Sequence, residues 1–313
     1  MVSAAASTTK SAADKRMTMR DAVARFVDDG ATVVIEGFTH LIGFAAGHEI
    51  IRQGKRDLVL ARLTPDLIYD QMIAAGCARK LVFSWAGNPG AGSLFGLRRA
   101  VEEGVPAPLE LEEYSHYGMV ARLTAGASKL PFAALRTFTG SDLPRVNPAI
   151  REVVCPYTGE RIPTVPALNP DVAIVHVQRA SADGSAQVWG LLGVQKEAAF
   201  AAARVIVVAE QIVDEVVVRA DPNRTLLPGF VVDAVVEEPW GCHPSYAQGY
   251  YDRDNDFYVG WGEVARERTG LERWLDEWVH GVSGRAEYVE KMGERLTRLR
   301  AKPRPSGVVD YGY

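Results

Sequence analysis

Residues 36–40, Glu-Gly-Phe-Thr-His, follow an apolar run at 31–35 and precede a segment with helical spacing. A glycine at the end of a strand lets the chain turn sharply. The backbone N–H groups of Phe38 and Thr39 can then face a ligand oxygen. The residues leave two interpretations open: a site for an anion or an oxyanion, or a tight turn packed by Phe38.

A second glycine-containing loop spans residues 84–96, with Gly90, Gly92 and Gly96 between a predicted strand and a predicted helix. An acidic strand that includes Glu110 follows about 20 residues later, as in the dinucleotide-binding fingerprint. The glycine spacing is one residue too long, and the loop follows the third predicted strand instead of the first. An NAD-binding protein is therefore an alternative supported only by this local motif.

The six histidines have no metal-binding spacing, and no metal ligands are predicted. His176 lies inside an apolar strand, which predicts a buried, hydrogen-bonded histidine. His40 and His116 lie near strand ends and are candidates for polar contacts. Glu36 and Glu210 end strands at the same edge of the predicted sheet. Each has two interpretations: a carboxylate of the active site, or an ordinary capping or solvated carboxylate.

Several catalytic motifs are absent from the sequence: the phosphate-binding G-x-x-x-x-G-K-[ST], the hydrolase G-x-S-x-G and the metalloprotease H-E-x-x-H. The three cysteines, Cys77, Cys155 and Cys242, form no C-x-x-C pair. This spacing indicates neither a zinc site nor a redox motif, and it is typical of a reducing cytoplasm, where we expect the protein to act.

The composition is that of a globular protein: 313 residues, 47% hydrophobic and 24% charged, with a net charge of −4. There is no basic excess, so neither nucleic acid nor an anionic membrane is an expected partner. No apolar run approaches the roughly 18 residues of a membrane span. We expect residues 1–15 to form a disordered tail and residues 303–313 a loose one.

Strands and helices alternate along most of the chain, which predicts an α/β fold with an open, mostly parallel sheet and helices on both faces. The pattern loosens into proline-rich loops over 132–167, and two amphipathic helices are expected at 263–280 and 284–299. The predicted strands are 31–35, 57–61, 80–84, 109–113, 171–177 and 204–209, and the predicted helices are 20–29, 44–53, 65–74, 94–102, 117–128 and 195–202. An α/β domain at 16–262 and a C-terminal helical extension at 263–302 follow.

Four long blocks carry a resemblance to a known family: "EGFTHLIGFAAGHEIIRQGKRDL", "RLTPDLIYDQMIAAGCARKLVFSWAGNPGAGSL", "AGASKLPFAALRTFTGSDL" and "HPSYAQGYYDRDNDFY". In this order they resemble the alpha, or A, subunits of family I CoA-transferases. The 3-oxoadipate type is the nearest likeness and the glutaconate type is more distant. The resemblance extends from about residue 19 to about residue 280.

The resemblance implies covalent catalysis with ping-pong kinetics, in which a glutamate carboxylate attacks an acyl-CoA thioester. CoA is a substrate in this chemistry, and no metal or redox cofactor is implied. In two-subunit members the glutamate lies in a Ser-Glu-Asn-Gly-like motif on the B subunit. This chain has no such motif, so we assign no catalytic nucleophile to it and expect activity only with a B subunit.

The resemblance also assigns the loop at residues 36–39 to a Gly-Gly-Phe-Gly-like family segment, with Glu36 and Thr39 in place of its outer glycines. Its implied role is to present N–H groups to the reacting carbonyl. The implied oxyanion- and acyl-binding residues are Gly37, Phe38 and Thr39. The candidate substrate-binding residues are Glu36, His40, Ser84, Asn88 and Gly90.

The implied reaction is transfer of CoA from succinyl-CoA to 3-oxoadipate, with acyl-CoA and dicarboxylic acid as ligands. Arg62 and Arg136 are hypotheses for the group that binds the second carboxylate. Alternatives are another dicarboxylate such as glutaconate, a CoA-thioester hydrolase or ring-opening subunit that uses Glu110, Glu112 or Glu113, and a non-catalytic scaffold subunit.

Overall fold

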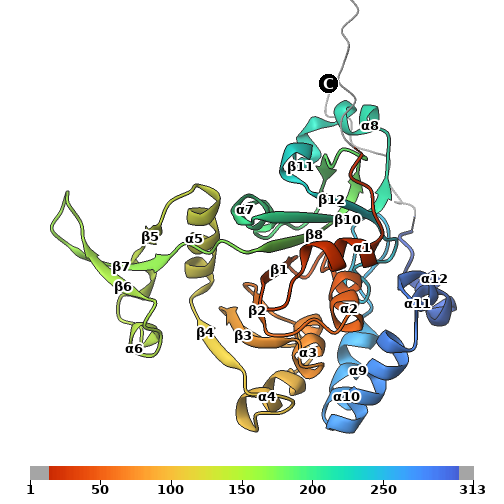
Figure 1. Cartoon of the computed structure of the whole chain (residues 1–313), viewed down its shortest axis with the longest axis horizontal. Coiled ribbons are helices and arrows are strands. Elements are labelled where there is room, and N and C mark those ends of the chain that lie inside the picture. Colours follow the sequence, from red (N-terminus) through yellow and green to blue (C-terminus); the bar gives the residue numbers. More distant parts are fainter. Residues whose placement is uncertain (1–13, 303–313) are drawn as a thin grey trace, which may run out of the picture.

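The computed structural model describes residues 14–302 (Figure 1). The tails predicted at 1–15 and 303–313 therefore lie outside the described residues, apart from residues 14 and 15. Lys15 lies against the main sheet, since its N–H donates to Ala182 O at 2.9 Å and its Nζ donates to Gly229 O at 2.7 Å. None of the helices within 14–302 is long and apolar enough to cross a membrane.

A parallel sheet forms the centre of the described region, in the order β12-β10-β8-β1-β2-β3-β4. This order confirms the predicted open, mostly parallel α/β sheet. Two short strands, β9 and β11, extend it by antiparallel pairing beyond the end of β8. The bounds are β1 (Thr32–Glu36), β2 (Leu58–Ala61), β3 (Ala78–Phe83), β4 (Glu110–Glu113), β8 (Val172–Ala180), β9 (Ala186–Gln187), β10 (Arg204–Ile212), β11 (Thr225–Leu227) and β12 (Ala234–Glu237).

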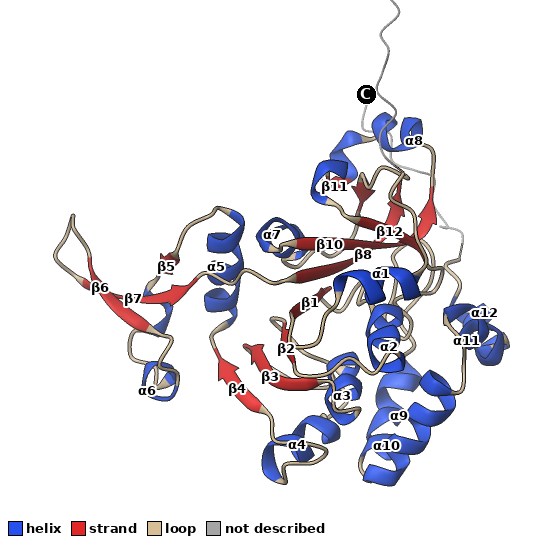
Figure 2. Cartoon of the chain, viewed as in Figure 1, coloured by secondary structure: helices blue, strands red, loops and turns tan. Residues whose placement is uncertain are grey.

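Helices cover both faces of this sheet, as Figure 2 shows. The α-helices are α1 (Met19–Phe26), α2 (Phe44–Arg52), α3 (Leu67–Ala74), α4 (Phe95–Glu102), α5 (His116–Ala127), α6 (Leu143–Val146), α7 (Gln195–Ala201), α8 (Glu215–Ala220), α9 (Asn255–Ala265), α10 (Arg268–Leu275), α11 (Arg285–Met292) and α12 (Glu294–Leu299). Short 3₁₀ turns lie at 136–138, 222–224 and 229–231, and a π-helical turn lies at 276–280.

The side chains of β1 alternate between two cores, as the two-residue period of a strand requires. Val33 and Ile35 belong to the core under α1, α2, α3, α9 and α10. Val34 belongs to a second core, which α5 and α7 cover. The strand is therefore buried on both faces, and only the loop at its carboxyl end can reach a ligand.

The structure corrects the prediction that residues 132–167 form only loops. Strands β5 (Phe132–Ala134), β6 (Arg151–Val154) and β7 (Arg161–Pro166) make a separate antiparallel sheet in the order β5-β7-β6. This sheet extends away from the main one, at the left of Figure 1, and packs on α5.

The C-terminal helices also differ from prediction. The single helix predicted at 263–280 is wrong, because α9 ends at Ala265 and α10 begins at Arg268. The helix predicted at 284–299 is divided at Gly293, whose φ of 55° separates α11 from α12. The left-handed region suits glycine and ends a helix.

Candidate active site

The loop after β1 turns where the sequence places Gly37. A Cβ atom on Gly37 would lie 2.5 Å from the carbonyl oxygen of Leu41 and 2.8 Å from that of His40, so the turn closes only over a glycine. Thr39 and Leu41 have φ values of 57° and 55°. Left-handed backbone is costly for branched residues, and such strain concentrates at functional loops.

This loop offers two backbone donors. Within residues 14–302, neither the N–H of Phe38 nor that of Thr39 donates to an acceptor in the chain. Both residues are partly exposed, whereas Gly37 is buried. N–H groups without an acceptor are free to donate to a ligand oxygen, which is what an oxyanion site requires.

His40 fixes the loop from behind. Its Nδ1 lies 2.9 Å from Leu191 O, and its Nε2 accepts the N–H of Gln248 at 3.0 Å. Nε2 must carry a lone pair to accept this bond, so the imidazole is neutral with its proton on Nδ1. Burial lowers the pKa of His40 and favours the same state. His40 is fully buried, so the substrate contact predicted for it gives way to a positioning role.

The segment 240–251 supplies further contacts to the same loop, although it lies about 200 residues away along the chain. Ser245 Oγ donates to Thr39 O at 2.8 Å, and Leu41 N–H donates to Tyr246 O at 3.0 Å. Sequence reasoning assigned no role to Ser245, Tyr246 or Gln248. The feature of the sequence that could have indicated their role is their place in the block "HPSYAQGYYDRDNDFY", one of the four that carry the family resemblance.

Glu36, the last residue of β1, is buried at 2% exposure. A Cβ on Gly193 would lie 3.2 Å from its Oε1 and 3.1 Å from Phe38 Cβ, so the segment around Gly193 covers the carboxyl. Burial raises the pKa of Glu36 against the opposing effect of the Arg62 cation. The predicted substrate contact of Glu36 would require Gly193 to move.

Arg62 lies beneath the loop and is only 1% exposed. Its Nη1 donates to Asp66 Oδ1 at 3.0 Å, and its Nη2 donates to Gly37 O. The hypothesis that Arg62 binds the second carboxylate of a substrate directly is therefore wrong. Its cation acts on the loop from the protein side.

Tyr69 of α3 separates the ends of β1 and β2 next to Arg62. Strands β1 and β2 pair in register up to Val34 and Ala61. Beyond that point the Tyr69 hydroxyl accepts the N–H of Ile35 at 3.1 Å and donates to Ala61 O at 2.9 Å. The hydroxyl replaces a ladder bond, and Arg62 follows directly after β2, below Gly37.

Ser84 lies at the carboxyl end of β3, on the same edge of the sheet. Its Oγ donates to Leu63 O at 2.6 Å and lies 3.0 Å from Nδ1 of His116. The hydroxyl proton is directed to Leu63, so Nδ1 of His116 is the donor in the second contact. The polar contacts predicted for His116 are confirmed.

Asn88 and Gly90 lie in a turn that packs on α9. Asn88 is buried, its Nδ2 donates to Tyr258 O at 2.7 Å, and its N–H donates to Gly92 O at 3.0 Å. Asn88 therefore anchors the turn, while Gly90, with φ 77°, is exposed at its tip.

The glycine pattern behind the NAD alternative has a packing explanation. A Cβ on Gly96 would lie 2.9 Å from Asp70 O, so this glycine permits close contact of α4 with α3. The bonds between Asn88 and Gly92 close the turn on itself.

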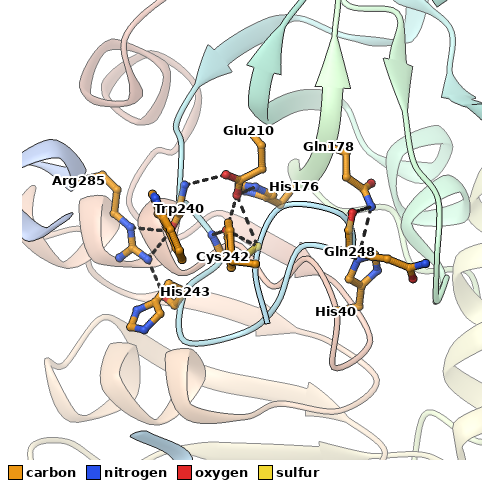
Figure 3. Close-up of polar contacts among 10 residues, drawn as sticks. His40, His176, Gln178, Glu210, Trp240, Cys242, His243, Gln248 and Arg285 are labelled. Atoms are coloured by element: carbon orange, nitrogen blue, oxygen red, sulfur yellow. Dashed lines mark hydrogen bonds and ion pairs between the residues drawn. The ribbon is translucent and has the colours of Figure 1, made fainter. Parts of the chain in front are cut away.

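Figure 3 shows a buried network around Glu210, in the last part of β10. Its carboxylate accepts the N–H of Trp240 at 2.7 Å and the Tyr251 hydroxyl, and it lies 2.8 Å from His176 Nε2. The predicted buried, hydrogen-bonded state of His176 is confirmed. The network fixes both ends of segment 240–251, which in turn holds the loop after β1.

His176, Glu210 and Cys242 also form a group of possible metal ligands, with their ligand atoms within 4.8 Å of one another. Burial raises the pKa of Cys242 well above its usual value, which keeps the thiol protonated. The Cys242 sulfur lies 3.7 Å from Glu210 and 2.9 Å from the Tyr251 hydroxyl. The Tyr251 hydroxyl contacts both the thiol and the Glu210 carboxylate, so the three side chains already belong to one hydrogen-bond network.

Two of the three carboxylates proposed for a hydrolytic alternative, Glu110 and Glu112, form ion pairs on β4. Lys80 pairs with Glu110 at 2.8 Å and with Glu112 at 2.5 Å. Burial acts in the opposite direction, but Lys80 and other donors hold the pKa of Glu112 below its usual value. Arg136 pairs with Glu160 at 2.6 Å on the antiparallel sheet, where both are exposed.

Comparison with known proteins identifies the family. The family model described as Coenzyme A transferase matches residues 16–238. The A subunit of the 3-oxoadipate CoA-transferase of Pseudomonas knackmussii is 55% identical over 278 residues, which cover 89% of this chain and 98% of that protein. The A subunit of the glutaconate CoA-transferase of Acidaminococcus fermentans is 32% identical, over 92% of this chain and 95% of that protein.

Solved structures indicate the same family. The crystal structure of glutaconate CoA-transferase from Acidaminococcus fermentans superposes with a TM-score of 0.87, over 92% of this chain and 96% of that one. The decarboxylase AibA/AibB, also 32% identical, has a TM-score of 0.71 over 84% and 98%. By sequence over most of its length and by fold, this chain belongs to the coenzyme A transferase family.

Proposed function

We propose that this chain is the A subunit of a heteromeric CoA-transferase that moves CoA from succinyl-CoA to 3-oxoadipate, with the glutamyl nucleophile on a partner B subunit. The 55% identity to the A subunit of a 3-oxoadipate CoA-transferase supports this substrate over glutaconate. The reaction needs CoA as a substrate and no metal or redox cofactor.

The observation that carries the proposal is the pair of amides at Phe38 and Thr39, which have no acceptor within residues 14–302. Two backbone N–H groups that are free to donate can stabilise a tetrahedral oxyanion. The nearest carboxyl, Glu36, is covered by Gly193 and has a raised pKa, so it is unsuited to nucleophilic attack. These contacts of Glu36 support a nucleophile that is contributed by another chain.

In the proposed reaction the partner carboxylate attacks the thioester carbon of succinyl-CoA. The carbonyl electron pair moves to oxygen, and the N–H groups of Phe38 and Thr39 stabilise that oxyanion. The C–S bond breaks, leaving a mixed anhydride and CoA thiolate. The thiolate attacks the glutamyl carbonyl and releases succinate, and the resulting enzyme–CoA thioester passes CoA to 3-oxoadipate by the same steps in reverse.

At the carboxyl edge of the sheet, large apolar side chains are exposed in a segment that contacts the loop and in another that directly follows β3. Leu191 is 42% exposed and Leu192 is 48% exposed, in the segment that covers Glu36, and Trp85 is 46% exposed after β3. Clustered exposed apolar residues are typical of contact surfaces. We propose that the B subunit covers this edge and brings its glutamate toward Phe38, with Ser84 and Gly90 lining the acyl group.

The test is a turnover assay with succinyl-CoA and 3-oxoadipate, on this chain alone and after co-purification with the B subunit encoded beside it. We expect activity only in the pair. Activity of this chain alone would contradict a split site. An assembled pair that uses glutaconate but not 3-oxoadipate would contradict the proposed substrate and retain the subunit role.

A further inference from the structure

We infer that Arg62 is a positioning residue that orients and polarises the Gly37–Phe38 peptide group, so that the Phe38 N–H becomes a stronger oxyanion donor. The inference rests on the proposed function and adds to it a residue that never touches substrate. Its basis is the contact of the Arg62 guanidinium with Gly37 O.

The geometry follows from the peptide bond itself. The C=O of Gly37 and the N–H of Phe38 belong to one planar, trans group and point in opposite directions. The C=O points inward, because it accepts a hydrogen bond from the buried Arg62. The N–H of Phe38 must therefore point outward, toward the partly exposed side of the loop.

Two physical effects follow. A hydrogen bond from a cation to the carbonyl oxygen draws electron density through the peptide and strengthens its N–H as a donor, by about 10–30% per bond in a chain of such bonds. The same bond opposes rotation of the peptide plane, which would turn the N–H away from the reacting carbonyl. The donor is thus oriented before the reaction begins.

The surrounding charges keep Arg62 in place. Burial alone would lower its pKa, but Asp66 and Glu36 raise it, so the guanidinium stays protonated. Its Nη1 is held by Asp66 Oδ1 at 3.0 Å, and its central carbon lies 5.6 Å from the centre of the Tyr69 ring. Asp66 and Tyr69 both belong to the start of α3, so Nη2 is directed at Gly37 O by a rigid element.

The test uses three variants of the A/B complex. Arg62→Met together with Asp66→Asn removes the buried cation and the carboxylate that it contacts directly. The remaining buried carboxyl is Glu36, whose pKa burial already raises. Arg62→Lys keeps the cation but loses the planar fork that contacts Asp66 and Gly37 together. Arg122→Met is the matched control, because Arg122 is also a buried arginine that pairs with a carboxylate, Glu112 at 2.8 Å, and donates to a backbone carbonyl.

We expect kcat of the double variant to fall by roughly 10²-fold, near the loss for one oxyanion donor. The KM for succinyl-CoA should stay within about threefold, because ground-state binding is unchanged. Arg62→Lys should fall between the double variant and wild type. In infrared spectra, the C=O stretch of the enzyme–CoA thioester that accumulates with succinyl-CoA should move toward its value in water.

A double variant with the kcat and infrared band of Arg122→Met would overturn the inference. If the double variant fails to assemble, Arg62→Lys tests the inference instead. A kcat of Arg62→Lys equal to that of Arg122→Met would then overturn it. The wild-type pair is assayed first with succinyl-CoA and 3-oxoadipate. Its inactivity would contradict the proposed function, whereas an active wild type with an unaffected variant contradicts only the role of Arg62.

Discussion

The Nε2 atom of His40 accepts a hydrogen bond from the backbone N–H of Gln248, 208 positions later in the chain, at 3.0 Å. This bond joins the loop after β1 to segment 240–251, which Glu210 anchors to the end of β10. The candidate oxyanion site is thus held by hydrogen bonds from three parts of the sequence, namely Arg62, Leu191 and segment 240–251. Its own two donors have no acceptor among residues 14–302.

Gly37→Ala should reduce kcat of the A/B complex by about 10²-fold or more, the loss expected when an oxyanion donor is displaced. The new Cβ would lie 2.5 Å from Leu41 O, so the backbone of the loop must shift. The measurement is steady-state kinetics of purified complexes, alongside a check that the variant assembles.

Gly260→Ala is the matched control. Gly260 lies within α9, and no heavy atom lies within 4 Å of the position of a new Cβ. Activity should be unchanged, and stability should rise by roughly 0.5–1 kcal/mol because alanine favours helix. Equal losses in both variants would argue against a special role for the turn at Gly37.

Thr39→Gly should keep kcat within a few-fold of wild type. The proposed donor is the backbone N–H of Thr39, which glycine retains, and glycine accepts the φ of 57° without strain. A loss of about 10²-fold would be on the scale of a lost oxyanion donor and would indicate that the threonine hydroxyl takes part in the reaction. Kinetics with succinyl-CoA distinguishes the two outcomes.

Tyr251→Phe should lower the free energy of unfolding by roughly 1–3 kcal/mol, the range for a hydrogen bond to a carboxylate. The lost hydroxyl donates to Glu210 inside the buried network. Urea denaturation measures the change, and Tyr157→Phe, at a side chain 94% exposed, is the control. Equal stability of the two variants would contradict a structural role for the network.

Acidification should destabilise the fold through buried histidines. Burial lowers the pKa of His48 from 6.5 to about 3 and that of His243 to about 4. Between those values and 6.5 the unfolded chain binds protons that the folded chain excludes. The stability that these two histidines contribute is therefore complete above about pH 6.5 and falls below it, by about 1.4 kcal/mol per pH unit for each histidine.

His48→Gln should reduce this slope by about 1.4 kcal/mol per pH unit between about pH 5 and pH 6. The control is His280→Gln, at an exposed position. Urea midpoints at several pH values give the slopes. An unchanged slope for His48→Gln would show that His48 is protonated in the folded chain.

The regular part of the fold could be predicted because β1, β2, β3 and β10 contain short apolar runs and each is followed by a helix. The antiparallel sheet at 132–166 escaped prediction because its strands are short, half exposed and interrupted by proline, as at Pro163 and Pro166. Helix α9 was missed because Gly260 and Gly262 weaken its helical pattern.

Only the part of the candidate site that depends on a glycine turn could be predicted from the sequence. Gly37 after an apolar strand indicated a sharp turn with exposed amides, and the structure has that turn. The tethers from Ser245 and Gln248 depend on contacts more than 200 residues apart, which no local pattern encodes. Arg62 was chosen for its charge at a strand end, but its burial under Gly37 depends on Tyr69 separating β1 and β2.

The measurement that tests the central claim most directly is intact-mass spectrometry of the A/B complex after incubation with succinyl-CoA and no acceptor acid. In ping-pong catalysis the enzyme–CoA thioester then accumulates. We predict a CoA adduct on the B subunit and none on this chain, which would supply only the amides of Phe38 and Thr39. A CoA or succinyl adduct on a carboxylate of this chain would contradict the account.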